Sequence, residues 1–174
     1  MVDETGIFFL ILSFMENKLD LDLIDLDILA LIQRDVSIST EFISQHVGIS
    51  KTPCWRRIQR LEKLGYIKKK VALLDANKLE VGVSVFVQIK TNRHDADWAD
   101  ELTHLIEGFP EVVEFYRMAG EYDYLLRVLV KDIGAYDEFY KKLIRSTSLT
   151  DVTSNFAMEQ IKYTTEVPLV TPKT

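Results

Sequence analysis

The sequence predicts an α+β protein in two parts, and two patterns of apolar residues support this. Apolar residues recur at helical spacing up to about residue 66, whereas from residue 83 onward short alternating segments lie between helical ones. The order of these later segments is strand, helix, strand, strand, helix, strand. This βαββαβ order is a split β-α-β pattern, which forms an antiparallel sheet with both helices on one face.

Three helices are expected in the first part, and each follows a residue that can cap it. Asp22 or Asp25 can cap the first helix, and Ser39 can cap a second, shorter one. Ser50 can cap a third helix, which ends at Gly65, since glycine most easily adopts the left-handed conformation that closes a helix. The short connection between the second and third helices is typical of a helix-turn-helix unit.

The second part is expected to contain four strands, at residues 83–90, 112–118, 122–130 and 152–161, with helices around Trp98 and Tyr136. Residues 67–74, which precede the first strand, alternate charged and apolar residues and are expected to be strand-like. By alternation, the sheet face away from the helices carries Phe86, Leu125, Leu129 and Ala157. Because an uncovered apolar face is a surface for association, we expect a homodimer packed sheet against sheet.

Composition excludes several classes of protein. A lone cysteine, Cys54, cannot form an internal disulfide, so the chain fits a reducing compartment such as the bacterial cytosol. The apolar run at residues 6–15 is about half as long as a membrane-spanning helix. Acidic residues precede this run, whereas a signal peptide has positive charge there. We therefore expect a cytoplasmic protein with neither a membrane span nor a secretion signal.

One short basic segment lies within an otherwise acidic chain. The net charge of the whole chain is −6, but residues 50–70 hold eight lysines and arginines against Glu62 alone, which gives +7. The segments before and after carry −7 and −6. Such a concentration is expected of a small element that contacts phosphates, although a solvated helix face explains the charge equally well.

The predicted third helix has an outer face suited to a DNA major groove. Cys54, Ile58, Leu61 and Leu64 fall on the inner side. On the outer side, arginine and glutamine can pair with base edges, while threonine and lysine can reach phosphates. Arg57 lies beside the apolar stripe, where it would clamp a phosphate or brace a neighbouring helix. The candidate DNA-binding residues are Ser50, Lys51, Thr52, Arg56, Arg57, Gln59, Arg60 and Lys63. The alternative is a packed three-helix bundle with a basic exterior.

Longer motifs extend the interpretation over residues 18–162. They are KLDLDLIDLDILALIQRD, SISTEFISQHVGIS and KTPCWRRIQRLEKLGYIKK in the first part, then MAGEYDYLLRVLV and MEQIK in the second. Together they resemble the Lrp/AsnC family of feast/famine transcriptional regulators. In that family a serine, a threonine and an arginine mark the recognition helix, and they match Ser50, Thr52 and Arg57. The glycine-acid-aromatic-Asp-Tyr signature of the effector domain matches residues 120–124, with Glu121 where aspartate is commoner.

The resemblance implies a winged helix-turn-helix domain, a strand hinge and a ferredoxin-like effector (RAM) domain, assembled as dimers and often octamers. It also implies small effectors, commonly amino acids, that bind where effector domains meet. The corresponding division of the chain is 1–17 as an N-terminal extension, 18–66 as the DNA-binding domain, 67–82 as the hinge, 83–164 as the effector and oligomerisation domain and 165–174 as a tail. Because the resemblance begins only at Lys18, we interpret the extension as foreign to the family, with Met15 as a candidate start.

The candidate effector-binding residues are Gly120, Glu121, Asp123 and Ser154. The N–H groups of Gly120 and Glu121 have no evident strand partner and could meet a carboxylate. Asp123 could accept an ammonium group or form an ion pair with Arg127. Ser154 in the last strand could add a hydroxyl group if it faces inward. This is a departure from the family, since in many relatives the last strand begins with threonines that help hold the ligand.

An enzyme is the rival hypothesis. The siroheme decarboxylases share the two-domain outline, but their chemistry needs histidines and basic residues around a large pocket, whereas the basic residues here concentrate on one helix. The three histidines are scattered and no cysteine–histidine cluster exists, so we expect no metal, no cofactor and no catalytic residue. A further alternative is an effector sensor that has lost DNA binding.

Overall fold

The computed structural model describes residues 21–93 and 95–170, which form two compact units. Of the described residues, the first unit holds 21–72 together with the C-terminal segment 163–170, and the second runs from Leu73 to Lys162. The N-terminal extension and Met15 lie outside the described residues. None of the helices in the described part is long and apolar enough to cross a membrane.

The first unit contains three helices, α2 (Leu23–Arg34), α3 (Thr40–His46) and α4 (Lys51–Lys63). Asp22 caps α2 in a reciprocal capping box, since its carboxylate accepts from the Asp25 N–H at 2.8 Å while the Asp25 carboxylate accepts from the Asp22 N–H at 3.2 Å. Ser39 caps α3, as expected. Ser50 occupies the N-cap position of α4 but makes no capping hydrogen bond. Gly65, with φ +80°, follows the end of α4, as the sequence predicts.

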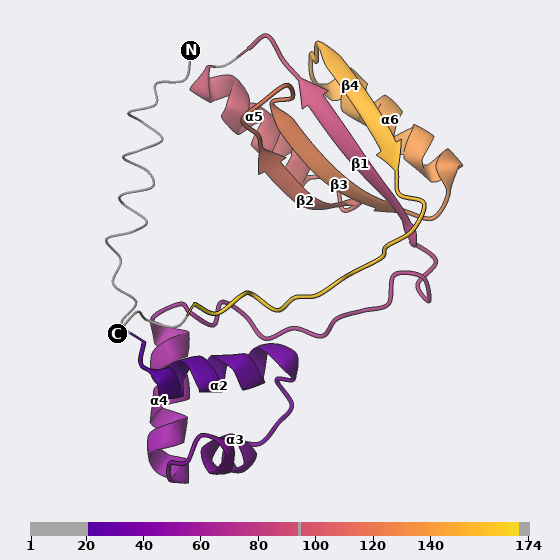
Figure 1. Ribbon diagram of the computed structural model, residues 1–174. Helices are drawn as coiled ribbons and strands as arrows, with labels where there is room; N and C mark the ends of the chain where they lie inside the picture. The colour runs from indigo at the N-terminus through magenta and orange to yellow at the C-terminus, as the bar shows by residue number, and fades with distance from the viewer. Residues whose placement is uncertain (1–20, 94, 171–174) are drawn as a thin grey trace. The chain divides into compact units, whose positions relative to one another are not determined.

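The helices of the first unit pack around one small apolar core (Figure 1). Its buried residues are Leu21, Leu26, Ile28, Ile43, Cys54, Ile58 and Leu61. The inner face of α4 thus contains Cys54, Ile58 and Leu61, as helical spacing predicts, whereas Leu64, also predicted to face the core, follows the end of the helix and is 53% exposed. This burial fixes which side of α4 remains exposed.

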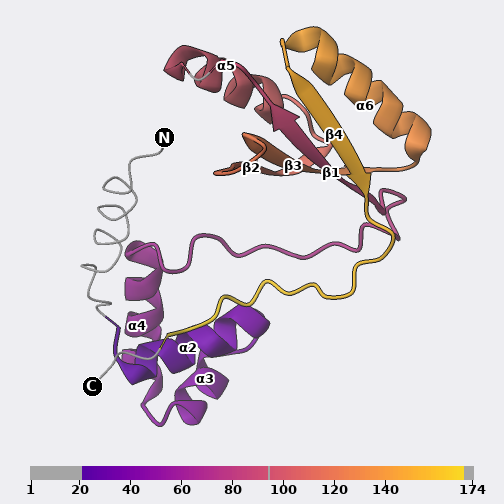
Figure 2. The same cartoon turned by 45° about the horizontal axis from the view of Figure 1, so that its top comes forward.

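The second unit is a four-stranded antiparallel sheet with two helices on one face, as Figure 2 shows. Its elements are β1 (Val83–Lys90), α5 (Ala96–Glu107), β2 (Val112–Arg117), β3 (Tyr124–Val130), α6 (Ile133–Ser146) and β4 (Asp151–Phe156). The strand order is β2-β3-β1-β4. This confirms the predicted βαββαβ topology.

The two faces of this sheet differ in burial. Val85 and Val87 of β1 and Leu126 of β3 are fully buried under α5 and α6. The opposite face carries Phe86, which is 37% exposed, together with the half-buried Leu125 and Leu129. The structure confirms the predicted inner face of β1, and no described helix or strand of the second unit covers the opposite face.

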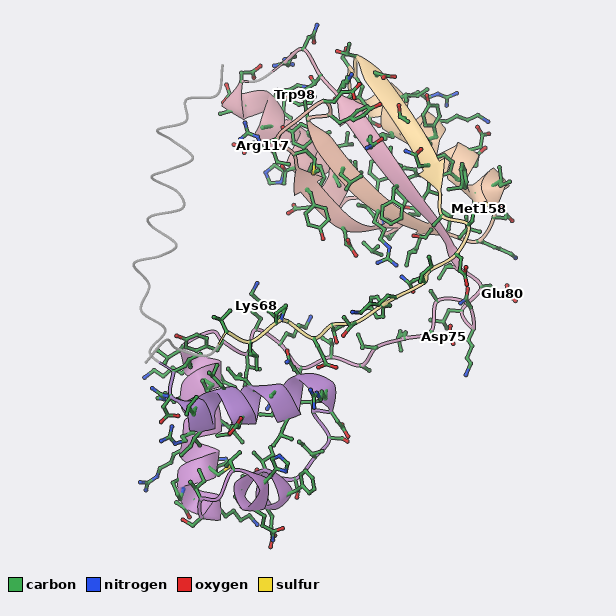
Figure 3. All side chains as sticks on the ribbon, viewed as in Figure 1. Lys68, Asp75, Glu80, Trp98, Arg117 and Met158 are labelled. Atoms are coloured by element: carbon green, nitrogen blue, oxygen red, sulfur yellow. The ribbon has the colours of Figure 1, made fainter. Side chains whose placement is uncertain are left out.

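Three differences from the predicted strands are larger than one residue. The last strand ends at Phe156 rather than at residue 161, after one further hydrogen bond from the Ala157 N–H to the Ser84 carbonyl. β3 begins at Tyr124 rather than at residue 122, and residues 67–82 contain no strand. Lys68, Asp75 and Glu80 mark this last segment in Figure 3. A strand needs a hydrogen-bonded neighbour, and no described segment pairs with residues 67–82.

Candidate nucleic-acid interface and effector site

The outward face of α4 gathers five of the predicted DNA-binding residues. Lys51, Thr52, Arg56, Gln59 and Lys63 are all exposed. Lys51 lies 3.6 Å from the Glu41 carboxylate, and the Gln59 side-chain amide donates to the Glu62 carboxylate at 3.2 Å. In the described part of the chain no carboxylate pairs with Arg56. Arg56 therefore presents an uncompensated guanidinium group to solvent.

Two predicted site residues, Arg57 and Arg60, point instead toward α2. The Arg57 guanidinium donates to Asp22 at 2.7 Å and to Asp25 at 2.9 Å, and Arg60 also donates to Asp25. The Asp25 side chain is completely buried. Of the two roles expected for Arg57, its contacts are therefore those of a brace between helices. The sequence interpretation of Arg60 as an outer-face residue missed its bond to Asp25.

The pKa directions agree with this ionic cluster. The hydrogen bond to Asp25, and to a lesser extent the one to Asp22, raises the pKa of Arg57 above its ordinary value. Burial alone would raise the pKa of Asp22, but hydrogen bonds from the Asp25 N–H and from Arg57 outweigh it and lower that pKa. Both directions favour the charged forms of Arg57 and Asp22, whose ion pair holds α4 against the start of α2.

Sequence reasoning missed Trp55, which borders the same face. Its side chain is 54% exposed. It lines an open hollow of about 250 Å³ together with Thr40, Lys51 and Thr52. The available signal was its position, three residues after Thr52 and directly before Arg56.

The predicted effector residues Gly120, Glu121 and Asp123 lie together in the connection between β2 and β3. The Met118 N–H donates to the Asp123 carbonyl at 2.8 Å, which closes the loop. Gly120 has a φ of +150°, which favours glycine. Neither the Gly120 nor the Glu121 N–H donates a hydrogen bond to any described residue. The loop therefore offers two unused donors.

The Asp123 carboxylate does not meet Arg127, one of the two partners considered for it. It accepts a hydrogen bond from the Thr91 N–H at 2.8 Å, and Thr91 is almost fully buried. Arg127 pairs instead with Glu114 at 2.8 Å. Asp123 thus ties its loop to the residue that follows β1.

A cationic side chain from the end of β1 lies against the same loop. Lys90 Nζ is 3.0 Å from the Glu121 carboxylate and 4.8 Å from the centre of the Tyr122 ring. The hydrogen bond to Glu121 raises the pKa of Lys90. The Tyr122 hydroxyl in turn lies 3.4 Å from the Thr153 hydroxyl on β4.

Ser154 is separated from this loop. Its hydroxyl is hydrogen-bonded to the Tyr136 hydroxyl of α6, so it points to the helix-covered side of the sheet. The hydroxyl that β4 contributes near the loop belongs to Thr153, which the sequence interpretation did not select. Alternation alone did not settle which of the two faced inward, because both are small polar residues.

Comparisons with known proteins agree over both units. Residues 21–68 match the model of a winged helix-turn-helix DNA-binding domain, and residues 84–167 match that of the Lrp/AsnC ligand-binding domain. The chain is 51% identical over 150 residues to the DNA-binding transcriptional activator DecR of Escherichia coli K12, which covers 86% of this chain and 99% of DecR. It is 45% identical over 149 residues to the glutamate uptake regulatory protein of Zymomonas mobilis, and the matched residues cover 86% of this chain and 91% of that protein.

Solved structures show the same relationship. An AsnC family transcriptional regulator from Agrobacterium tumefaciens superposes with a TM-score of 0.83 at 51% identity, covering 85% of this chain and 97% of its own. A transcriptional regulator from Neisseria meningitidis, solved as a complex with L-methionine, superposes with a TM-score of 0.81 at 30% identity. The superposition covers 85% of this chain and 96% of the Neisseria chain. These relatives are regulators, so the decarboxylase alternative is not supported. The chain belongs to the Lrp/AsnC family of DNA-binding transcriptional regulators.

Proposed function

We propose that this protein binds double-stranded DNA through the exposed face of α4 and regulates transcription in response to a small effector. The observation that carries the proposal is the separation of the basic residues of α4 into two groups. Arg57 and Arg60 are engaged with Asp25, whereas Arg56, Gln59 and Thr52 are exposed on the outward face. The first group positions the helix, and the second is available to read bases.

The exposed residues suit direct readout of a sequence. Arginine pairs with the two acceptors of guanine, and glutamine pairs with the donor and acceptor of adenine. Lys51 and Lys63 lie near the two ends of α4, where ammonium groups can neutralise phosphates on either side of the groove. We therefore retain Ser50, Lys51, Thr52, Arg56, Gln59 and Lys63 as the DNA-binding set and assign Arg57 and Arg60 to positioning.

The effector in this proposal is an amino acid or a similar small zwitterion. The unused N–H groups of Gly120 and Glu121 suit a carboxylate, and the Asp123 carboxylate suits an ammonium group. The complex of the Neisseria regulator with L-methionine supports an effector of this class. Thr153 takes the place of Ser154 in the proposed site, because its hydroxyl lies on the Tyr122 side of β4.

The proposed assembly is a homodimer in which the uncovered sheet faces pack together, with octamers built from such dimers. Phe86, Leu125 and Leu129 would form the centre of that interface. A dimer would carry two copies of α4, and half-sites spaced by one helical turn of DNA, or a multiple of it, would match them.

Selection of DNA sequences from a random duplex pool tests the proposal. The expected product is a two-fold symmetric motif. The protein should bind it with an affinity at least about 10³-fold higher than for scrambled DNA at the same salt concentration. Fluorescence anisotropy at several salt concentrations provides the comparison, since phosphate contacts make both affinities fall as salt rises. Failure to enrich any motif would contradict sequence-specific regulation.

A further inference from the structure

We propose that Trp55 is a specificity-determining residue that reads the 5-methyl group of a thymine in the major groove. The inference rests on the proposed binding of α4 to DNA and adds a residue that polar readout does not include. Trp55 is 54% exposed, whereas Trp98, the other tryptophan of the chain, is 2% exposed. An indole left this open on a cationic helix is suited to a contact that one chain alone does not supply.

The position of Trp55 on α4 places it beside the base-reading residues. It lies one helical turn after Thr52 and one turn before Gln59, and directly precedes Arg56. The buried residues Cys54 and Ile58 lie on the other flank of Trp55, with Ile58 three residues ahead. Trp55 therefore stands at the boundary between the readout face and the core, with its side chain 54% exposed.

The hollow beside Trp55 combines two chemistries. The indole forms an apolar wall, while Thr40, Thr52 and Lys51 contribute two hydroxyl groups and an ammonium group. A thymidine nucleotide of the duplex presents the same combination, with a methyl group at the groove edge and a phosphate nearby. A protein partner with an apolar anchor fits less well, because Lys51 and Arg56 flank the indole with positive charge.

Thymine is the base that this wall can distinguish. Among the four bases it alone carries a methyl group in the major groove, and apolar side chains are its usual partners. Arginine and glutamine read guanine and adenine by hydrogen bonds, so Trp55 would extend readout to a third base. Burial of one methyl group corresponds to roughly a fourfold change in affinity.

Replacement of single thymines by deoxyuridine tests the inference, because it removes only the methyl group. Starting from the selected motif, each thymine is replaced in turn, and affinities are measured for the wild type, Trp55→Ala, Trp55→Phe and Phe42→Ala. The wild type should lose affinity about fourfold at one thymine per half-site. Trp55→Ala should bind the thymine and uracil duplexes equally at that position, and Trp55→Phe should keep part of the difference.

Phe42→Ala is the matched control, since Phe42 is an aromatic residue of the same unit, 51% exposed but on α3. Phe42→Ala should lose as much affinity as the wild type when the sensitive thymine is replaced by deoxyuridine, a loss called here the uracil effect. Thermal unfolding should show that all three variants are folded. The inference is overturned if Trp55→Ala retains the uracil effect, or if no thymine is sensitive in the wild type. A motif that is selected and bound in either case leaves the proposed function standing, whereas the absence of any motif would contradict that function instead.

Discussion

Arg56 and Arg57 are neighbours in the sequence with opposite surroundings. Arg56 is exposed, whereas Arg57 is 29% exposed and bonded to two carboxylates, one of them completely buried. A buried carboxylate that loses a partner is costly, while an exposed guanidinium group contributes little to folding. The same residue type therefore serves two purposes in adjacent positions.

Arg57→Ala should lower the free energy of unfolding by about 2 kcal/mol, because Asp25 would keep only Arg60 as a charged partner. Arg56→Ala, the matched control one residue away, should change stability by less than about 0.5 kcal/mol. Urea denaturation of both variants provides the measurement. Equal stability of the two would show that the contacts of Arg57 with α2 are not important for folding.

Asp22 should make the free energy of unfolding depend on pH in the acidic range. Its pKa is lowered in the folded chain, so its contribution is complete above the ordinary value of 3.8 and is lost as the pH falls through the lowered value. We expect the melting temperature to fall less steeply between neutral pH and about pH 3 in Asp22→Asn than in the wild type. Identical slopes would contradict the stabilised carboxylate.

At the scale of elements, local patterns predicted most of the fold. Apolar spacing and the capping residues Asp22 and Ser39 place helices where the structure has them, since these signals act within a few residues. Contacts between distant residues were not predictable from spacing. Arg57 and Asp25 are 32 residues apart, and the partner of Asp123 proved to be a backbone N–H group of Thr91 rather than a charged side chain. The predicted strand at 67–74 lacked a partner for the same reason.

The Asp123 carboxylate accepts a hydrogen bond from the Thr91 N–H and, in the proposed effector site, also accepts the ammonium group of the ligand. Asp123→Ala should destabilise the second unit by about 1–3 kcal/mol, because the buried Thr91 N–H loses its acceptor. Asp123→Asn keeps an acceptor oxygen and should lose much less. Urea denaturation separates the two variants.

The same pair isolates the effector role. Calorimetry over the twenty amino acids should identify a ligand for the wild type, and Asp123→Asn should weaken its binding while remaining folded. Unchanged binding by a folded Asp123→Asn would contradict the assignment of this carboxylate to an ammonium group.

At the scale of the whole molecule, charge and apolar surface indicate different contacts. The chain is acidic overall but strongly basic over residues 50–70, which favours nucleic acid at α4. The uncovered sheet face of the second unit favours a second copy of the chain.

Phe86→Asp should convert the proposed dimer to a monomer, since it places a charge at the centre of the proposed sheet interface. Ile133→Asp is the matched control, because Ile133 is 72% exposed at the start of α6, on the other side of the sheet. Analytical ultracentrifugation should give the mass of a single chain for the first variant and, for the second, the wild-type mass of two chains or a multiple of two. A dimeric Phe86→Asp protein would place the interface elsewhere.

The affinity of Arg56→Ala for the selected motif tests whether α4 reads DNA through its exposed residues. Loss of an arginine–guanine pair should weaken specific binding by about 1–3 kcal/mol while binding to scrambled DNA changes much less. Urea denaturation of the same sample should show unchanged stability. Specific affinity equal to that of the wild type would contradict the assignment of α4 as the recognition helix.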